Sequence, residues 1–439
     1  MTRFTSILLA AAAALAAAVL VLVIVRYPVG DFDMLQMAVY LGAPAAIALT
    51  ALSCLRLSAE NRMMVIISGF SALVAVYAAE AWFAVAPPED FRFDRSRPFD
   101  TRSKLDVLAD LRADGKEAYP AIHPHFFMPR SSAEHGAFRV SAGGNDILPL
   151  GSISQVLNVH CNESGKWVIY RSDRHGFNNP DEVWDQPTPL AAVGDSYTNG
   201  FCVTPGEDMT SLLRESRPGA INLGASGNGP LLMLAGIRDY LADRRPPVVI
   251  WFFYDGNDLQ ELTVELEHPV LQRYLEPGFR QEIERYRGEI DRQLKQQALT
   301  REAAERREFW KRILLLRNLR QRLLAPPQYY QPPPDADLTD FLKVIGMARD
   351  EVAGWGGRLE FVYLPNWQTL HGERPGEKER VIDAVRGAGI PTHDATDWLA
   401  ASGDWEKVFW DPTSHYNAAG YRLVAEGLSA ALKKNETGR

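Results

Sequence analysis

A serine at the end of a short apolar run is the first residue in this chain with a clear chemical use. Ser196 closes the sequence Val193-Gly194-Asp195-Ser196, directly after an apolar run over 190–193. If that run is a strand, the glycine relaxes the following turn and presents the hydroxyl at the sheet edge where ligands bind. A serine hydroxyl is a poor nucleophile until an imidazole accepts its proton, so a histidine must join it. Alone, Gly-Asp-Ser fits a turn or a helix cap equally well.

Three later segments supply a histidine and neutral hydrogen-bond donors. They are Asn222 to Gly229, Asp255 to Asp258, and Asp411 to Asn417, which contains His415. The first two follow expected strands, and the third precedes the last expected helix. Each residue alone could be a turn glycine, a helix cap or a surface histidine, but their joint order predicts a site.

With the Ser196 segment, these motifs resemble the four sequence blocks of the SGNH (GDSL-like) hydrolase superfamily, over about half of the chain. The resemblance implies that Ser196 is the nucleophile and His415 its general base. It also implies an oxyanion hole made by the backbone N–H groups of Ser196 and Gly227 and the side-chain amide of Asn257. This agrees with the chemistry, because a developing oxyanion needs preorganised neutral donors in a dry site. Glycine allows close backbone approach, and an Asn amide donates without charge.

The acid is where the sequence departs from the family pattern. The family's orienting Asp usually stands three residues before the His, whereas Asp411 stands four before His415. The turn at Pro412 absorbs the extra residue, or a backbone carbonyl orients the imidazole and leaves a dyad. Asp394 and Asp397 are spare candidates, although they are expected in the loop of the fifth strand.

Other residues receive more modest interpretations. Asp195 is expected to brace the serine turn. His123 and His125 are interpreted as loop histidines, because no third metal ligand follows at a suitable spacing, and we expect neither metal nor cofactor. Cys161 and Cys202 could form a disulfide in an oxidising compartment or remain two buried thiols, and the sequence leaves both open.

The elements that must position these residues follow an α/β pattern after Pro187. Short apolar runs alternate with helical segments, which predicts a parallel sheet covered on both faces: a flavodoxin-like three-layer sandwich, the SGNH hydrolase fold. The expected strands are 190–193, 220–223, 248–254, 359–364 and a short piece near 391–393. The expected site lies at their carboxyl ends.

A charged helical insert at about 259–334 interrupts this domain. Its apolar cluster could cover the mouth of the site, or the insert could be a helical arm packed on the side of the domain. The cluster consists of Phe309, Trp310, Ile313, Leu314 and Leu316.

Three apolar stretches before Pro87 are long enough to span a membrane as helices: Thr5 to Val25, Met34 to Leu55, and Met63 to Ala79 with its continuation to Val85. The first could instead be a signal peptide, although it lacks a clean cleavage site. Basic Arg3, Arg56 and Arg62 place their loops in the cytoplasm, so the chain after Pro87 is expected outside it. We expect a transmembrane region over 1–86, a linker and accessory segment over 87–185, and the hydrolase-like domain over 186–434.

The net charge of -8 comes from 47 basic and 55 acidic residues that are interspersed. Nucleic acid is therefore excluded as a partner, since no basic stripe exists for a phosphate backbone. The segment from Tyr170 to Pro180 is similar to a motif that precedes the first strand in bacterial envelope SGNH proteins, which points to glycan modification. The alternative is that this segment only closes one end of the sheet.

The resulting expectation is a protein of the bacterial inner membrane with its catalytic domain in the periplasm. It would hydrolyse or transfer acyl groups, acetyl above all, on envelope glycans or lipids. The alternative is a catalytically impaired subunit that binds glycan or assists an envelope polysaccharide machinery.

Overall fold

The structure is a computed structural model, and it describes residues 2–26, 32, 34–85, 98–128, 139–324, 337–373, 376–411 and 414–437. Contacts divide the chain into two compact units. One comprises 1–87 together with 304–330, and the other comprises 88–303 together with 331–439. The expected linker up to residue 97, and the expected end of the insert at 334, lie outside the described residues.

The first unit contains three helical segments that are long and apolar enough to cross a membrane: Thr2–Arg26, Met34–Cys54 and Ala59–Ala84. These agree with the three predicted spans. Their elements are α1 (Thr2–Arg26), α2 (Met34–Met37), the π-helical η2 (Ala38–Gly42), α3 (Ala43–Cys54) and α4 (Ala59–Val85). Large apolar side chains such as Leu22 and Phe70 are exposed on these helices, as expected of surfaces that meet lipid.

The second unit is built on a five-stranded parallel sheet with the order β10-β9-β8-β6-β7. The predicted α/β fold is confirmed, and all five expected strands are present. Their bounds are β6 (Ala191–Val193), β7 (Ile221–Asn222), β8 (Val248–Tyr254), β9 (Arg358–Leu364) and β10 (Thr392–Asp394).

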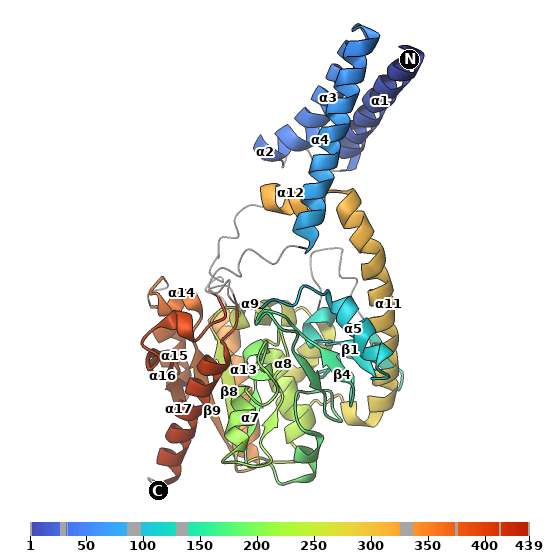
Figure 1. Cartoon of the computed structure of the whole chain (residues 1–439). Coiled ribbons are helices and arrows are strands. Elements are labelled where there is room, and N and C mark those ends of the chain that lie inside the picture. Colours follow the sequence, from blue (N-terminus) through green and yellow to red (C-terminus); the bar gives the residue numbers. More distant parts are fainter. Residues whose placement is uncertain are drawn as a thin grey trace. The chain divides into compact units, whose positions relative to one another are not determined.

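Helices cover both faces of this sheet, some of which are labelled in Figure 1. Because β8 is buried on both faces, its alternate side chains belong to two separate cores, with Trp251 in one and Phe252 in the other. The Trp251 core includes residues of α8 (Pro230–Gly236), η5 (Ile237–Leu241), α9 (Asp258–Glu265), α13 (Asp337–Gly354) and α15 (Glu377–Gly387). The Phe252 core includes residues of α7 (Met209–Arg214), α16 (Thr396–Ala400) and α17 (Ala418–Thr437).

An accessory layer precedes the main sheet in the sequence. Its three short strands pair in the order β1-β4-β5, and a separate hairpin joins β2 to β3. Its elements are α5 (Lys104–Ala113), β1 (Ala118–Pro120), η3 (Pro124–Phe127), β2 (Val140–Ala142), β3 (Asn145–Ile147), β4 (Leu157–Val159), β5 (Ile169–Arg171) and η4 (Asp181–Asp185).

Helices make up the described part of the region expected as an insert, about 259–334, which includes α9. The first part of its long helix α11 (Arg287–Leu314) is an arm on the domain, because Ile290, Leu294 and Ala298 are buried in the Trp251 core. The rest of the insert from residue 304 belongs to the unit of the apolar helices. The other insert elements are α10 (Pro269–Gln272), η6 (Arg273–Leu275), η7 (Ile283–Tyr286) and α12 (Arg317–Leu324). The remaining short elements, all in the second unit, are α6 (Ser196–Asn199), α14 (Trp367–Leu370) and η8 (Trp405–Lys407).

Candidate active site

Ser196 begins α6, immediately beyond the carboxyl end of β6. The turn needs glycine at 194, because a Cβ there would lie 2.0 Å from the Thr198 hydroxyl oxygen. Asp195 caps the short helix by accepting a hydrogen bond from the backbone N–H of Tyr197 at 2.9 Å, which fits its expected bracing role. Burial raises the pKa of the Asp195 carboxyl to about 6. Ser196 itself is 5% exposed, so its hydroxyl lies in a largely water-excluded position.

His415 lies next to this serine although the two residues are 219 positions apart. Its Nε2 is 2.8 Å from Ser196 Oγ, within hydrogen-bond reach. The ring stacks on Phe201 with centroids 4.3 Å apart and also contacts Tyr197 at 4.8 Å. These two aromatic neighbours fix the orientation of the imidazole toward the serine.

The carboxylate at the other ring nitrogen is that of Glu163, not that of Asp411. His415 Nδ1 lies 3.0 and 3.2 Å from the two Glu163 carboxylate oxygens, and the backbone N–H of His415 donates to the same group at 3.3 Å. Burial alone would raise the pKa of Glu163, but the charge and hydrogen bonds of His415 outweigh it and hold the pKa below its ordinary value. Ser196, His415 and Glu163 therefore form one hydrogen-bonded chain.

Asp411 instead belongs to a turn that precedes His415. Its backbone N–H donates to the Ser414 hydroxyl at 2.8 Å, and its carbonyl accepts from the Ser414 N–H at 3.2 Å. Pro412, which was expected to absorb the extra residue, lies outside the described residues. The spare candidate Asp394 pairs with Lys378 at 3.0 Å, at the end of the fifth strand.

A disulfide between Cys161 and Cys202 holds the Glu163 segment in place. The backbone N–H of Glu163 donates to Cys202 Sγ at 3.1 Å, and the adjacent Phe201 N–H donates to the carbonyl of Ser196 at 3.0 Å. The bridge thus connects the carboxylate to the loop that follows the serine. The sequence did not predict a role for Glu163. Its position two residues after Cys161 was the one feature that pointed to it.

The glycine-rich loop after β7 packs on the serine turn. The N–H of Ala225 donates to the carbonyl of Gly194 at 3.3 Å. Gly227 has a φ of +70°, and a Cβ there would lie 2.7 Å from the ring of His125. His125 Nδ1 is 2.6 Å from the carbonyl oxygen of Ser226, and His123 Nδ1 accepts from the Ser226 N–H at 3.3 Å. The two histidines therefore hold this loop, and the described residues contain no group of three or more His, Cys, Asp or Glu side chains that could hold a metal ion.

Glu265 holds the far end of the same loop. Its carboxylate accepts hydrogen bonds from the N–H groups of Gly229 at 2.6 Å and Leu231 at 2.8 Å, where α8 begins. Burial raises the pKa of Glu265 to about 8.

Asn257 follows β8, whose neighbour in the sheet is β6. It stands at the N-cap position of α9, where its backbone carbonyl accepts from the Glu261 N–H at 2.9 Å, but its side chain makes no cap hydrogen bond. Its Oδ1 atom is buried and has no hydrogen-bond partner among the described residues. Because β8, β6 and β7 are adjacent and parallel, Asn257, Ser196 and Gly227 all follow carboxyl ends at the same edge of the sheet.

The segment from Tyr170 to Pro180 is organised around a buried carboxylate. Asp173 accepts from the indole N–H of Trp184 at 2.7 Å and the amide of Asn179 at 2.8 Å. Asn179 also donates to the carbonyl of Asn222 at 2.8 Å, and Asn178 donates to the carbonyl of Asn199 at 2.9 Å. These contacts give the segment a structural role in supporting α6 and β7.

Between 55 and 58% of the chain matches solved structures of esterases and of a putative lipolytic protein. A two-domain esterase (CEX) active on acetylated mannans matches at 13% identity with a TM-score of 0.32, over 58% of this chain and 52% of that one. This chain thus spans about half the length of that esterase. A putative lipolytic protein of the G-D-S-L family from Desulfitobacterium hafniense DCB-2 matches at 13% identity and a TM-score of 0.31, over 55% and 97% of the two chains.

A third solved structure, the acetyl xylan esterase AlAXEase, matches at 13% identity and a TM-score of 0.32, over 55% and 98% of the two chains. No family model and no curated protein matches the sequence. At these identities the likeness concerns the fold alone.

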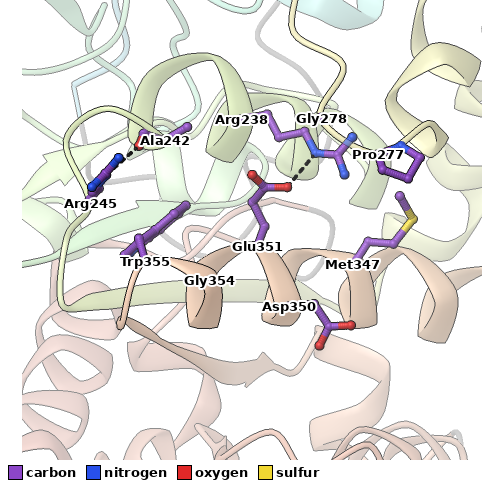
Figure 2. A pocket seen from close by; sticks show the side chains of 10 residues that line it. All are labelled: Arg238, Ala242, Arg245, Pro277, Gly278, Met347, Asp350, Glu351, Gly354 and Trp355. Carbon is purple, nitrogen blue, oxygen red and sulfur yellow. Dashed lines mark hydrogen bonds and ion pairs between the residues drawn. The ribbon is translucent and has the colours of Figure 1, made fainter.

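A hollow of about 600 Å³ lies elsewhere in the same unit and shares no residue with the site (Figure 2). Arg238 and Glu351 form an ion pair of 3.1 Å in its wall, so these two charges are already matched. The indole N–H of Trp355 donates to the carbonyl of Pro246 at 3.0 Å.

Proposed function

We propose that the chain is a membrane-anchored serine esterase or O-acyltransferase in which Ser196, His415 and Glu163 form a catalytic triad. The observation that carries the proposal is the continuous hydrogen-bonded chain from the serine hydroxyl through both imidazole nitrogens to one carboxylate. Three such groups, brought from distant segments into the correct order, are what activation of a serine requires.

In the proposed reaction, Ser196 Oγ attacks the carbonyl carbon of an acyl ester while its proton passes to His415 Nε2. Glu163 stabilises the resulting imidazolium and keeps the ring in the required tautomer. The N–H groups of Ser196 and Gly227 and the amide of Asn257 donate to the oxyanion. Collapse of the intermediate forms an acyl-serine and releases the alcohol, which takes the proton from His415. Water or a second hydroxyl then accepts the acyl group, which gives hydrolysis or transfer.

The substrate class we propose is an acyl ester of an envelope glycan or lipid, with the site on the outer side of the bacterial inner membrane. The apolar helices and the positive charges of their loops support this location. The Cys161–Cys202 disulfide also supports it, because disulfides persist in oxidising compartments such as the periplasm. We also propose that the protein acts together with an envelope polysaccharide machinery.

The alternative is a catalytically impaired binding or assembly subunit. It was favoured by Asp411, which stands four residues before His415 where the family usually has three. Glu163 supplies a carboxylate at the imidazole, which removes the feature that favoured that alternative. We therefore propose an active enzyme.

The proposal is tested with the full-length chain in detergent. A fluorophosphonate probe should label the parent at Ser196, and the parent should cleave p-nitrophenyl acetate. Ser196→Ala should abolish both, whereas Ser141→Ala, at an exposed serine in the β2–β3 hairpin, should leave both unchanged. Equal cleavage rates in the parent and Ser196→Ala would overturn the enzyme assignment.

A further inference from the structure

The end of α11 carries an exposed apolar surface, which we call the apolar tip and define as residues 309–315. Four of its large side chains are strongly exposed: Phe309 at 42%, Trp310 at 66%, Leu314 at 65% and Leu315 at 62%. By helical spacing, Phe309, Trp310, Ile313 and Leu314 share one side, while Glu308, Lys311 and Arg312 lie on the other. Soluble surfaces rarely leave such a group uncovered, so the tip requires an apolar neighbour.

The chain around the tip contacts the apolar helices directly. Tyr77 of α4 donates a hydrogen bond through its hydroxyl to the carbonyl of Leu314 at 3.0 Å. Arg320 donates to the hydroxyl of Tyr40 at 2.8 Å, and its guanidinium lies 4.9 Å from the centre of that ring. All these residues belong to the same compact unit, and Figure 1 shows α12 beside one end of α4.

Glu80 provides the strongest of these attachments. Its side chain is fully buried, and its carboxylate accepts from the Asn318 N–H at 3.0 Å, the Asn318 amide at 2.8 Å and the Leu319 N–H at 2.7 Å. The two backbone N–H groups belong to the first turn of α12, where no helical carbonyl precedes them, so Glu80 caps this helix. Glu80 therefore has specific partners in the insert.

The bend before α12 fixes the direction of the tip. Leu316 adopts a φ of +52°, which a bulky L-residue rarely adopts. This turn ends α11 at Leu314 and redirects the chain into α12, where it meets Glu80 and Tyr40.

We propose that the apolar tip inserts into the lipid interface beside α4 and forms a second attachment of the chain to the membrane. Continuity with α4 argues for lipid as the occupant, because α4 exposes Trp82 to 66% within the same unit. Aromatic side chains concentrate at the level of the lipid headgroups. An apolar helix side backed by Arg312 and by Lys311, which pairs with Glu308, suits the boundary between acyl chains and headgroups. This proposal is independent of the proposed catalytic function.

The first test cuts the chain between the apolar helices over 2–85 and the residues from 98 onward. A protease site placed within 88–97 of the full-length protein is cleaved after reconstitution into lipid nanodiscs. Because Glu80 also holds the fragment through α12, all proteins in this test carry Glu80→Ala. The 98–439 fragment of this parent should stay with the nanodisc, and adding Trp310→Glu and Leu314→Glu should release it. Two such residues should change partitioning roughly a hundred-fold.

A matched control comes from the same helix. Leu299 is 49% exposed on α11 but lies in the other unit, so Leu299→Glu should leave the fragment bound. Release of the parent fragment would overturn the proposal, as would equal retention of the double variant. Retention that depends on a second copy of the chain, detected by cross-linking, would replace lipid by that copy as the occupant and would also overturn it.

A second measurement covers the case in which the charged variant fails to fold. The difference in tryptophan fluorescence between the parent and Trp310→Phe reports Trp310 alone. This difference should be strongly reduced in nanodiscs made with brominated acyl chains, which quench nearby tryptophans. The signal lost on Trp82→Phe serves as the positive control. An unquenched Trp310 signal beside a quenched Trp82 signal would exclude lipid contact by the tip.

Discussion

The imidazole of His415 is held from several directions. Ser196 and Glu163 occupy its two nitrogens, and Phe201 and Tyr197 contact its faces. Glu163 also accepts from the backbone N–H of the same histidine, so one carboxylate fixes both ring and main chain. This arrangement leaves the ring little freedom to turn away from the serine, which is the requirement for a general base.

Substitution of Glu163 and of Asp411, the acid expected from the sequence, should affect kcat very differently. Glu163→Gln should lower kcat for p-nitrophenyl acetate by roughly 10² to 10⁴, because the amide cannot stabilise an imidazolium or select the tautomer. Asp411→Asn should change kcat by no more than a few fold, because the second ring nitrogen of His415 is already occupied by the Glu163 carboxylate. Steady-state kinetics on the two variants decides between them, and a larger loss in Asp411→Asn would restore the expectation from sequence.

The difference between these residues shows what sequence spacing can reveal. Ser196 and Gly227 lie in the turns after β6 and β7, and His415 precedes α17, so local motifs were enough to predict them as candidates. Glu163 is 252 positions from His415 and reaches it through an accessory layer and a disulfide. A search for the acid by its spacing from His415 could identify only a residue close in sequence, such as Asp411.

The central strands could be predicted closely because they are buried on both faces, which gives continuous apolar runs. The predicted strand 248–254 coincides with β8, and 359–364 differs from β9 by one residue at its start. The destination of the insert could not be predicted in this way. The contacts of Glu80 with Asn318 and Leu319 join residues about 238 positions apart, and neither segment carries a periodic pattern that indicates its partner.

The glycine-rich loop provides a test of how an element shapes the site. Gly227→Ala should lower kcat by roughly 10² to 10³, because the new Cβ meets the His125 ring and displaces the N–H proposed to bind the oxyanion. It should also cost about 1 kcal/mol of stability, since φ at 227 is +70°.

Gly403→Ala is the matched control for Gly227→Ala. Its φ of +68° imposes the same backbone strain, but nothing lies within 4 Å of the added Cβ. Thermal unfolding should show the cost of backbone strain in Gly403→Ala and at least as large a loss in Gly227→Ala, whose Cβ also meets His125. Kinetics should show a loss only in Gly227→Ala. Normal activity in Gly227→Ala would remove this N–H from the proposed mechanism.

At the scale of the whole molecule, the disulfide connects the accessory layer to the sheet domain at the point where the site is assembled. Glu163 and Cys161 come from the former, and Cys202 follows the nucleophile turn in the latter. The position of the carboxylate therefore depends on a covalent link between two layers and not only on packing.

Reduction of this bridge should lower kcat by roughly 10²-fold, the effect of a misplacement of about 1 Å in a catalytic group. The measurement is activity with and without tris(2-carboxyethyl)phosphine, at a temperature where thermal unfolding shows that the reduced protein remains folded. In Glu163→Gln, the reductant should cause no further loss, because the group that the bridge positions is already gone. A reductant effect of equal size in this variant would show that the bridge acts through another part of the fold.

The Cys161–Cys202 disulfide also affects when, after synthesis, the protein becomes active. If the domain is exported as we propose, newly made protein that has not yet crossed the membrane keeps its thiols reduced, since the cytosol is a reducing environment. Such a precursor would possess every side chain of the site but would lack the covalent step that sets Glu163 beside His415. Under the proposed location, oxidation after export would then delay the proposed ester chemistry until the domain is outside the cytoplasm.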